Sequence, residues 1–134
     1  MIQFLTEMLT RNHILVVDDD AAVRRLTCVY LENCGFSVLE ADGGHQAISV
    51  FLRNFSSVTL LLSDVVMPEM TGPELAAELL RFRPDLPVLF MTGGCGNLVD
   101  ALKGYGCVPK PFLLRELLEN VRGLLAQSPA PSPA

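Results

Sequence analysis

The chain has 134 residues, half of them hydrophobic, which suits one compact domain with its own core. Its formal net charge is −5, and the ten basic residues are scattered apart from Arg24 with Arg25 and Arg81 with Arg83. This pattern argues against direct nucleic-acid binding. No apolar run reaches the roughly 18 residues of a membrane span, so we expect no membrane insertion.

The two ends of the chain lie outside the predicted domain, which covers residues 13–126. Residues 1–12 include Glu7 and lack a positively charged start, which argues against a signal peptide. We expect this segment to form either a short extra helix or a frayed arm. Residues 127–134 are rich in proline, serine and alanine, so we expect a disordered tail, either a plain terminus or the start of a linker.

The cysteines form neither a CxxC pair nor a recognised metal spacing. They are Cys28, Cys34, Cys95 and Cys107. With only two histidines in the chain to assist them, a metal site built on these thiols is not expected. We predict reduced thiols in a cytoplasmic protein.

Strand and helix patterns alternate along the chain, beginning with a strand over His13–Val17. Its apolar residues are mostly β-branched, which is typical of a strand covered by helices on both faces. A helix is expected from about Ala21 to Cys34, and Gly35 is suited to end it. The apolar residues on one face of this helix are Val23, Leu26 and Tyr30.

The second unit begins with a half-exposed strand over residues 36–40. Asp42 and the two glycines after it open a second helix. Its apolar residues share one face and are Ala47, Ile48, Phe51, Leu52 and Phe55. A third strand is predicted over residues 58–63, which are apolar almost throughout.

The second half of the chain continues the alternation. A loop over residues 68–73 leads into a helix that Thr71 or Gly72 can cap and that ends at residues 83–85. Strands follow over 87–91 and 106–109, the latter at a sheet edge because Pro109 cannot donate a ladder hydrogen bond. A last amphipathic helix is expected from Phe112 to about Ala126.

This order predicts an α/β doubly wound domain, with a parallel sheet, helices on both faces and right-handed crossovers. In such sheets the working site lies beyond the carboxyl ends of the strands, where the strand order reverses. The polar residues that directly follow the predicted strands are Asp18, Asp19, Asp20, Asp64, Thr92 and Lys110. We therefore expect acids, a hydroxyl and an ammonium to meet around one site.

The chemistry of this set favours phosphoryl transfer. Two carboxylates about 4 Å apart repel by roughly 4 kcal/mol near a protein surface, so a cation is expected between them. Magnesium prefers about six oxygen ligands, some of them water. A carboxylate can also act as the nucleophile that accepts a phosphoryl group, whose charge Lys110 and Thr92 would help to neutralise.

The motifs VVDDD, SDVVMP, TG and KPF, in this order, resemble the receiver domain of two-component response regulators from Ile14 to Ala126. The resemblance implies a flavodoxin-like (βα)5 fold with strand order 2-1-3-4-5. It also implies that Asp64 accepts the phosphoryl group and that Thr92 and Lys110 contact it. The Mg²⁺ (or Mn²⁺) ligands that it implies are Asp18, Asp19, Asp64 and the backbone carbonyl of Val66.

The resemblance further implies a cis peptide bond between Lys110 and Pro111. Asp20 falls outside the acidic pair and is expected to cap the first helix. The implied partners are a sensor histidine kinase or phosphotransfer protein and a downstream protein target. A monomer and a phosphorylation-favoured dimer both remain open. The segment Gly72–Leu75 is similar to receivers attached to hybrid sensor kinases.

The chain departs from the family pattern at several positions. Only 18 positions separate Thr92 from Lys110, so the helix expected at about Asn97–Lys103 should be about one turn short. Cys107 stands where receivers usually carry an aromatic switch residue. Two interpretations of this cysteine remain open: a small buried replacement for the aromatic residue, or a redox sensor. Val66 and Gly94 offer no polar group to orient a water molecule, which predicts slow to moderate self-dephosphorylation.

Two other functions are weighed against the phosphoacceptor. The first is a receiver-like interaction module that no longer depends on phosphorylation, favoured by the short helix and by Cys107. The second is a hydrolase with an aspartyl-phosphate intermediate, which would need an acid where Val66 stands. We therefore expect a signalling protein rather than an enzyme. Dinucleotide binding is disfavoured because no GxGxxG follows the first strand.

Overall fold

The computed structural model describes residues 13–93 and 105–127. Its strands are β1 (His13–Val17), β2 (Ser37–Ala41), β3 (Val58–Asp64), β4 (Val88–Thr92) and β5 (Gly106–Pro109). Its helices are α2 (Ala21–Asn33), α3 (Gly44–Arg53), α4 (Gly72–Phe82) and α5 (Leu114–Gln127). The predicted N-terminal arm, the short helix at 97–103 and most of the predicted tail lie outside the described residues.

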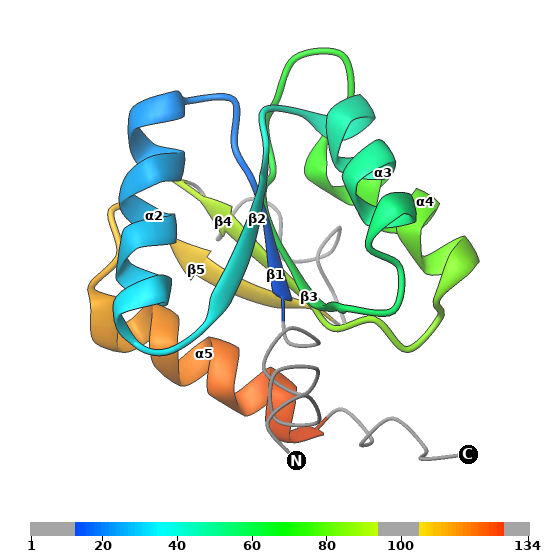
Figure 1. Cartoon of the computed structure of the whole chain (residues 1–134). Coiled ribbons are helices and arrows are strands. Elements are labelled where there is room, and N and C mark those ends of the chain that lie inside the picture. Colours follow the sequence, from blue (N-terminus) through cyan, green and yellow to red (C-terminus); the bar gives the residue numbers. More distant parts are fainter. Residues whose placement is uncertain (1–12, 94–104, 128–134) are drawn as a thin grey trace.

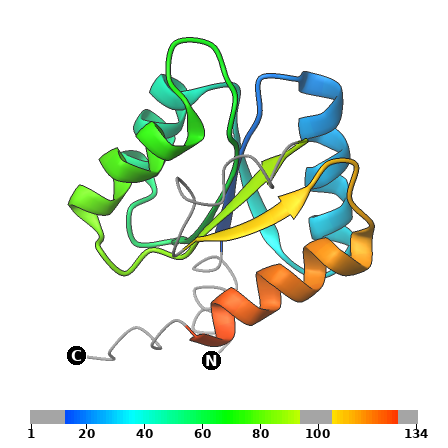
Figure 2. The same ribbon diagram turned by 180° about the vertical axis from the view of Figure 1, so that it is seen from behind.

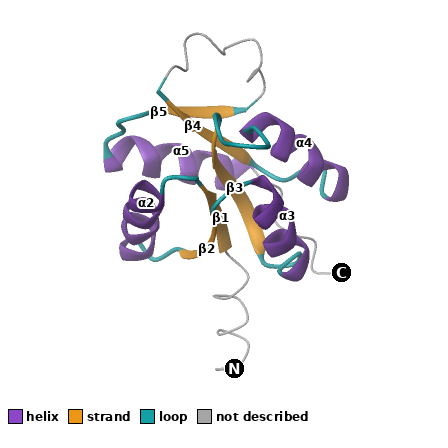
Figure 3. Cartoon of the chain, turned by 90° about the horizontal axis from the view of Figure 1, so that it is seen from above, coloured by secondary structure: helices purple, strands orange, loops and turns teal. Residues whose placement is uncertain are grey.

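The strands form one parallel sheet in the order β2-β1-β3-β4-β5 (Figure 1), which confirms the predicted order. Figure 2 shows β5 as the outermost strand on the side away from β2, in agreement with the edge position inferred from Pro109. Helices α2 and α5 cover one face of the sheet, and α3 and α4 cover the other (Figure 3). The predicted α/β doubly wound architecture is therefore correct.

The core consists of two apolar layers, one on each face of the sheet. Successive strand residues point to opposite faces, so Ile14 and Val16 pack toward α2 and α5, whereas Leu15 and Val17 pack toward α3 and α4. This explains why β1 is apolar at consecutive positions. Strands β2 and β4 each begin and end one residue later than predicted, within the usual uncertainty of element boundaries.

The predicted apolar faces of the helices are partly wrong. Leu26 is 51% exposed, and the buried side of α2 is instead formed by Thr27, Cys28 and Leu31. Thr27 can be buried because its hydroxyl donates to the Val23 carbonyl at 2.9 Å. Other predicted apolar-face or helix residues that are exposed are Leu52, Phe55, Leu113 and Leu114. Apolar spacing alone therefore did not identify the side of α2 that contacts the sheet, whereas Ala47 and Phe51 of α3 are buried as predicted.

The helix ends agree better with the sequence. The Asp20 carboxylate accepts hydrogen bonds from the backbone N–H groups of Ala22 and Val23, which confirms it as the N-cap of α2. Gly35, just after α2, has φ of +95°, a conformation that favours glycine. Helix α4 begins with a capping box between Thr71 and Glu74, one of the two caps that the sequence offered.

Gly72, the first residue of α4, lies against the end of β3. A Cβ atom at this position would lie 2.3 Å from the Asp64 carbonyl oxygen and 3.1 Å from the Phe90 ring. The Gly72 N–H donates to the Val65 carbonyl at 2.8 Å, so the helix start cannot move away without losing this bond. The absence of a side chain here allows α4 to begin directly beside Asp64.

We predict that Gly72→Ala lowers the free energy of unfolding by about 1–3 kcal/mol, because the added methyl group overlaps backbone atoms. Urea denaturation followed by circular dichroism measures this change. Gly123→Ala is the matched control, because a Cβ there meets nothing within 4 Å and alanine favours the helical interior of α5. A Gly72→Ala variant as stable as the parent would contradict the close approach.

Candidate functional site

An acidic cluster lies at the carboxyl edge of the sheet, where β1 and β3 end side by side. One carboxylate oxygen from each of Asp18, Asp19 and Asp64 lies within 4.8 Å of the others. Asp18 and Asp19 directly follow β1, and Asp64 is the last residue of the neighbouring strand β3. The predicted convergence of these acids is therefore present in the structure.

Asp18 is fully buried, and both of its carboxylate oxygens are hydrogen-bonded. Oδ1 accepts from the Asp20 backbone N–H at 2.9 Å, and Oδ2 accepts from the Lys110 ammonium at 2.8 Å. The Asp18 backbone N–H donates to the Ala41 carbonyl at 3.2 Å, which continues the β1–β2 ladder by one residue. These bonds give Asp18 a defined orientation, whereas Asp19 is exposed.

Lys110 joins the acids from the other side of the site. Its ammonium lies 2.8 Å from Asp18 Oδ2 and 3.2 Å from Asp64 Oδ2, so it bridges the ends of β1 and β3. The Lys110 backbone N–H donates to the Thr92 carbonyl at 2.8 Å, which holds the residue just beyond β5. The Lys110–Pro111 peptide is cis, in agreement with the sequence-based expectation.

The electrostatics of the cluster are unbalanced. Burial raises the pKa of the Asp64 carboxyl above its ordinary value; the charge of Lys110 opposes this rise, and the charge of Asp18 adds to it. Burial alone would lower the pKa of Lys110, but its hydrogen bond to Asp18 and the nearby acids raise it. Three carboxylates thus face one ammonium, and this excess of negative charge on oxygen ligands suits a hard divalent cation.

The remaining predicted residues lie around this edge or outside the described part of the chain. Thr92 is buried at the end of β4, next in order to β3. The side chain of Val66 is 72% exposed, two residues beyond Asp64. Gly94 lies outside the described residues, so its expected influence on phosphoryl lifetime stays a prediction.

The prediction of reduced thiols is only partly correct. Cys28 and Cys34 are free, and burial raises the pKa of the Cys28 thiol to about 12, which keeps it neutral. Cys107, half-buried in β5, is disulfide-bonded, which corrects the prediction at this position. The fourth cysteine, Cys95, lies outside the described residues.

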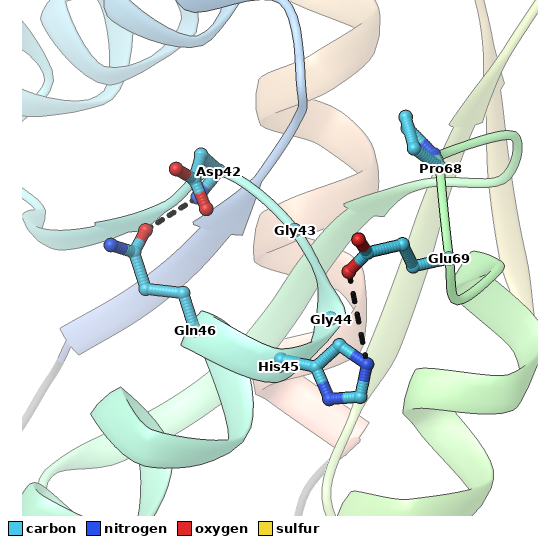
Figure 4. A pocket seen from close by; sticks show the side chains of 7 residues that line it. All are labelled: Asp42, Gly43, Gly44, His45, Gln46, Pro68 and Glu69. Atoms are coloured by element: carbon cyan, nitrogen blue, oxygen red, sulfur yellow. Dashed lines mark hydrogen bonds and ion pairs between the residues drawn. The ribbon is translucent and has the colours of Figure 1, made fainter.

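A small cavity of about 130 Å³ lies near the acidic edge, between the loop after β2 and the loop after β3 (Figure 4). Its lining residues are Asp42, Gly43, Gly44, His45, Gln46, Pro68 and Glu69. His45 Nε2 and Glu69 Oε2 lie 4.0 Å apart across it, with both side chains largely exposed. None of the predicted site residues lines this cavity, so the acidic cluster is a separate feature.

Two residues that the sequence analysis did not identify are connected to the acidic cluster. Arg24 of α2 donates from Nη1 to the Asp18 carbonyl at 2.6 Å and from Nε to Glu40 Oε1 at 3.1 Å. The sequence showed only an adjacent arginine pair, Arg24 and Arg25. Their shared partner on β2 could not be inferred without the fold.

Comparisons with known proteins agree with this geometry. A family model described as response regulator receiver domain matches residues 14–122. The chain is 35% identical over 116 residues to the sensor kinase CckA of Brucella abortus, covering 84% of this chain and 12% of that protein. It is also 35% identical over 118 residues to the response regulator receiver protein CpdR of Brucella abortus, covering 85% and 97%.

Solved structures give the same result. The crystal structure of the receiver domain of the hybrid histidine kinase CckA matches with a TM-score of 0.74 and 34% identity, covering 84% of this chain and 98% of that one. The chain spans about half, 49%, of the probable transcriptional regulator ycf27 of Pyropia yezoensis, so some relatives are considerably longer. Among the described residues, no helix combines the length and apolarity needed to cross a membrane.

The charge balance of the cluster leads to a prediction about proton binding. Because the Lys110 ammonium favours the ionised form of Asp64, Lys110→Met should raise the pKa of Asp64 above its already raised value. Carboxyl ¹³C NMR titration in the absence of divalent cations measures both values. Arg122→Met, which removes an exposed charge on α5, is the control and should leave the titration unchanged. An unchanged or lowered Asp64 pKa in Lys110→Met would contradict the charge assignment.

Proposed function

Because this chain belongs to the response regulator receiver domain family, we propose that it is a phosphoacceptor switch in two-component signalling, with Asp64 as the phosphorylated residue. One observation carries this proposal. Asp18, Asp19 and Asp64 converge at one edge of the sheet, and the ammonium of Lys110 bridges two of them. A nucleophile, a cation site and a phosphate-pairing charge would thus lie within one cluster.

The residues present suit a bound magnesium or manganese ion. Asp19 and Asp64 would be direct ligands, Asp18 would complete the acidic pair, and the backbone carbonyl of Val66 would supply a further oxygen. When bound, the ion would neutralise charge on the phosphoryl oxygens during transfer. The burial of Asp18 and its hydrogen bonds fix one side of this ligand set before any ion arrives.

The transfer itself requires little from the protein beyond positioning. An oxygen of the ionised Asp64 carboxylate attacks the phosphorus of a phosphohistidine. The O–P bond forms as the P–N bond breaks, and the imidazole leaves and takes up a proton from solvent. Lys110 already lies 3.2 Å from Asp64, so its ammonium can pair with the incoming phosphoryl oxygens. The Thr92 hydroxyl would contact the group from the end of β4.

The donor would be a sensor histidine kinase or a phosphotransfer protein, and the output a downstream protein target. The new charge on Asp64 would shift the equilibrium of the adjoining loops and helices. The net charge of −5 is in keeping with a protein partner rather than nucleic acid. A monomer that dimerises on phosphorylation and one that does not are both compatible with this function.

A module that binds partners without phosphorylation is the second candidate. The observation that favours it is Cys107, because a disulfide-bonded cysteine cannot turn between buried and exposed positions as an aromatic side chain can. The acidic cluster favours the phosphoacceptor, since an interaction module has no use for three converging carboxylates.

Incubation with acetyl phosphate and Mg²⁺ should add one phosphoryl group to the chain, detected by intact-mass spectrometry. Asp64→Asn should abolish labelling, because an amide cannot attack phosphorus. Asp42→Asn is the control: it removes an exposed acid after β2 that lies outside the cluster, and should be labelled like the parent. Chelation by EDTA should prevent labelling. A parent chain that remains unlabelled would favour the phosphorylation-independent module, and labelling of Asp64→Asn would place the acceptor elsewhere.

A second prediction concerns the lifetime of the phosphorylated state. The side chain at position 66 is exposed beside Asp64, and valine cannot orient a water molecule for attack on the acyl phosphate. Val66→Asn should therefore shorten the phosphoryl half-life several-fold, measured by loss of the added mass after removal of the donor. Val66→Ala is the control and should leave the half-life close to that of the parent. A half-life of only seconds in the parent, unchanged in Val66→Asn, would contradict this role.

A further inference from the structure

Arg24 lies between the acidic cluster and the edge strand β2. Its guanidinium donates from Nη1 to the Asp18 carbonyl at 2.6 Å and from Nε to Glu40 Oε1 at 3.1 Å. The Arg24 side chain is 16% exposed and that of Glu40 is 29% exposed. The contact is therefore partly shielded from water, and its geometry is better defined than that of a surface ion pair.

The carbonyl that Arg24 binds belongs to the peptide group joining Asp18 to Asp19. The preceding peptide is also fixed, since the Asp18 N–H donates to the Ala41 carbonyl at 3.2 Å. Both peptide planes flanking Asp18 are thus tied to neighbouring elements. The direction in which the Asp19 side chain leaves the backbone depends on the second of these planes, and Arg24 holds that plane.

We propose that Arg24 is a positioning residue for the acidic pair: anchored by Glu40, it orients the Asp18–Asp19 peptide so that both carboxylates face the cation. This inference rests on the proposed function, because it assumes that the cluster binds a divalent cation. Residues that orient metal ligands without touching the metal typically change metal affinity by about 10–100-fold when they are replaced. Arg24 would be such a residue, acting through a backbone carbonyl.

The role requires the shape of a guanidinium and not just its charge. The Nε and Nη1 donors of arginine point to two acceptors from one rigid plane, and here the two acceptors come from different elements, β2 and the loop after β1. The single ammonium of lysine cannot reproduce this planar fork. Arg24→Lys therefore keeps the charge and removes the geometry.

The adjacent Arg25 provides a matched control. It also forms an ion pair with Glu40, through Oε2, but its side chain is 57% exposed. The hydrogen bond to the Asp18 carbonyl comes from Arg24. Arg25→Lys therefore changes the same ion-pair network by the same chemical substitution, without altering the contact with the Asp18–Asp19 peptide.

The test is Mg²⁺ binding by the unphosphorylated chain, measured by isothermal titration calorimetry. Arg24→Lys should raise the dissociation constant about tenfold or more, and Arg25→Lys should leave it within about twofold of the parent. Glu40→Gln, which removes the anchor of Arg24, should give an intermediate rise. Urea denaturation on the same samples checks folding, and Glu40→Gln serves as the test variant if Arg24→Lys does not fold.

A second readout separates positioning from general destabilisation. In acetyl phosphate labelling, Arg24→Lys should shift the Mg²⁺ concentration at half-maximal rate more than it lowers the rate at saturating Mg²⁺. Equal Mg²⁺ affinity of Arg24→Lys and the parent, or an equal shift in Arg25→Lys, would overturn the inference while leaving the proposed function intact. A parent chain that binds no Mg²⁺ would overturn both.

Discussion

The site depends on the burial of β1 and β3 as parallel neighbours. Their apolar side chains fill the layers on both faces of the sheet, and each buried Å² of apolar surface contributes roughly 25 cal/mol. Because parallel strands end at the same edge, this burial brings Asp18, Asp19 and Asp64 together despite their mutual repulsion. Lys110 offsets part of the repulsion, and the remaining negative charge is the basis of the proposed cation site.

The sequence was most informative about the strands and about the polar residues that directly follow them. Continuous apolar runs predicted the strands closely, and the polar residues after them predicted which groups would meet. Sequence reasoning was weakest for helix faces. Leu26 continues the apolar spacing of α2, yet Thr27 is buried in its place because its hydroxyl bonds back to the Val23 carbonyl. The spacing of apolar residues does not predict that a polar side chain can be buried by hydrogen bonding to its own helix.

Contacts between distant segments could not be inferred for a different reason. Arg24 and Glu40 are separated by 16 positions, and their pairing depends on how α2 packs beside β2. The close approach of Gly72 to Asp64 likewise needs the crossover from β3 to α4 to be known. The disulfide at Cys107 corrected an expectation based on composition and compartment. The contacts of Arg24 and Gly72 were determined by tertiary packing and not by sequence spacing.

The start of α4 has a mechanical consequence. Gly72 abuts the Asp64 carbonyl and its N–H is bonded to Val65, while Thr71 and Glu74 lock the first turn. The carboxyl end of β3 and the first turn of α4 are therefore in tight contact. The far end of α4 is held as well, because Arg83, which follows Phe82, donates hydrogen bonds to the carbonyls of Phe55 and Val58. Helix α4 is therefore attached at both ends, so a change at the Asp64 end of β3 would reach it as strain in its first turn and not as a free rotation of the whole helix.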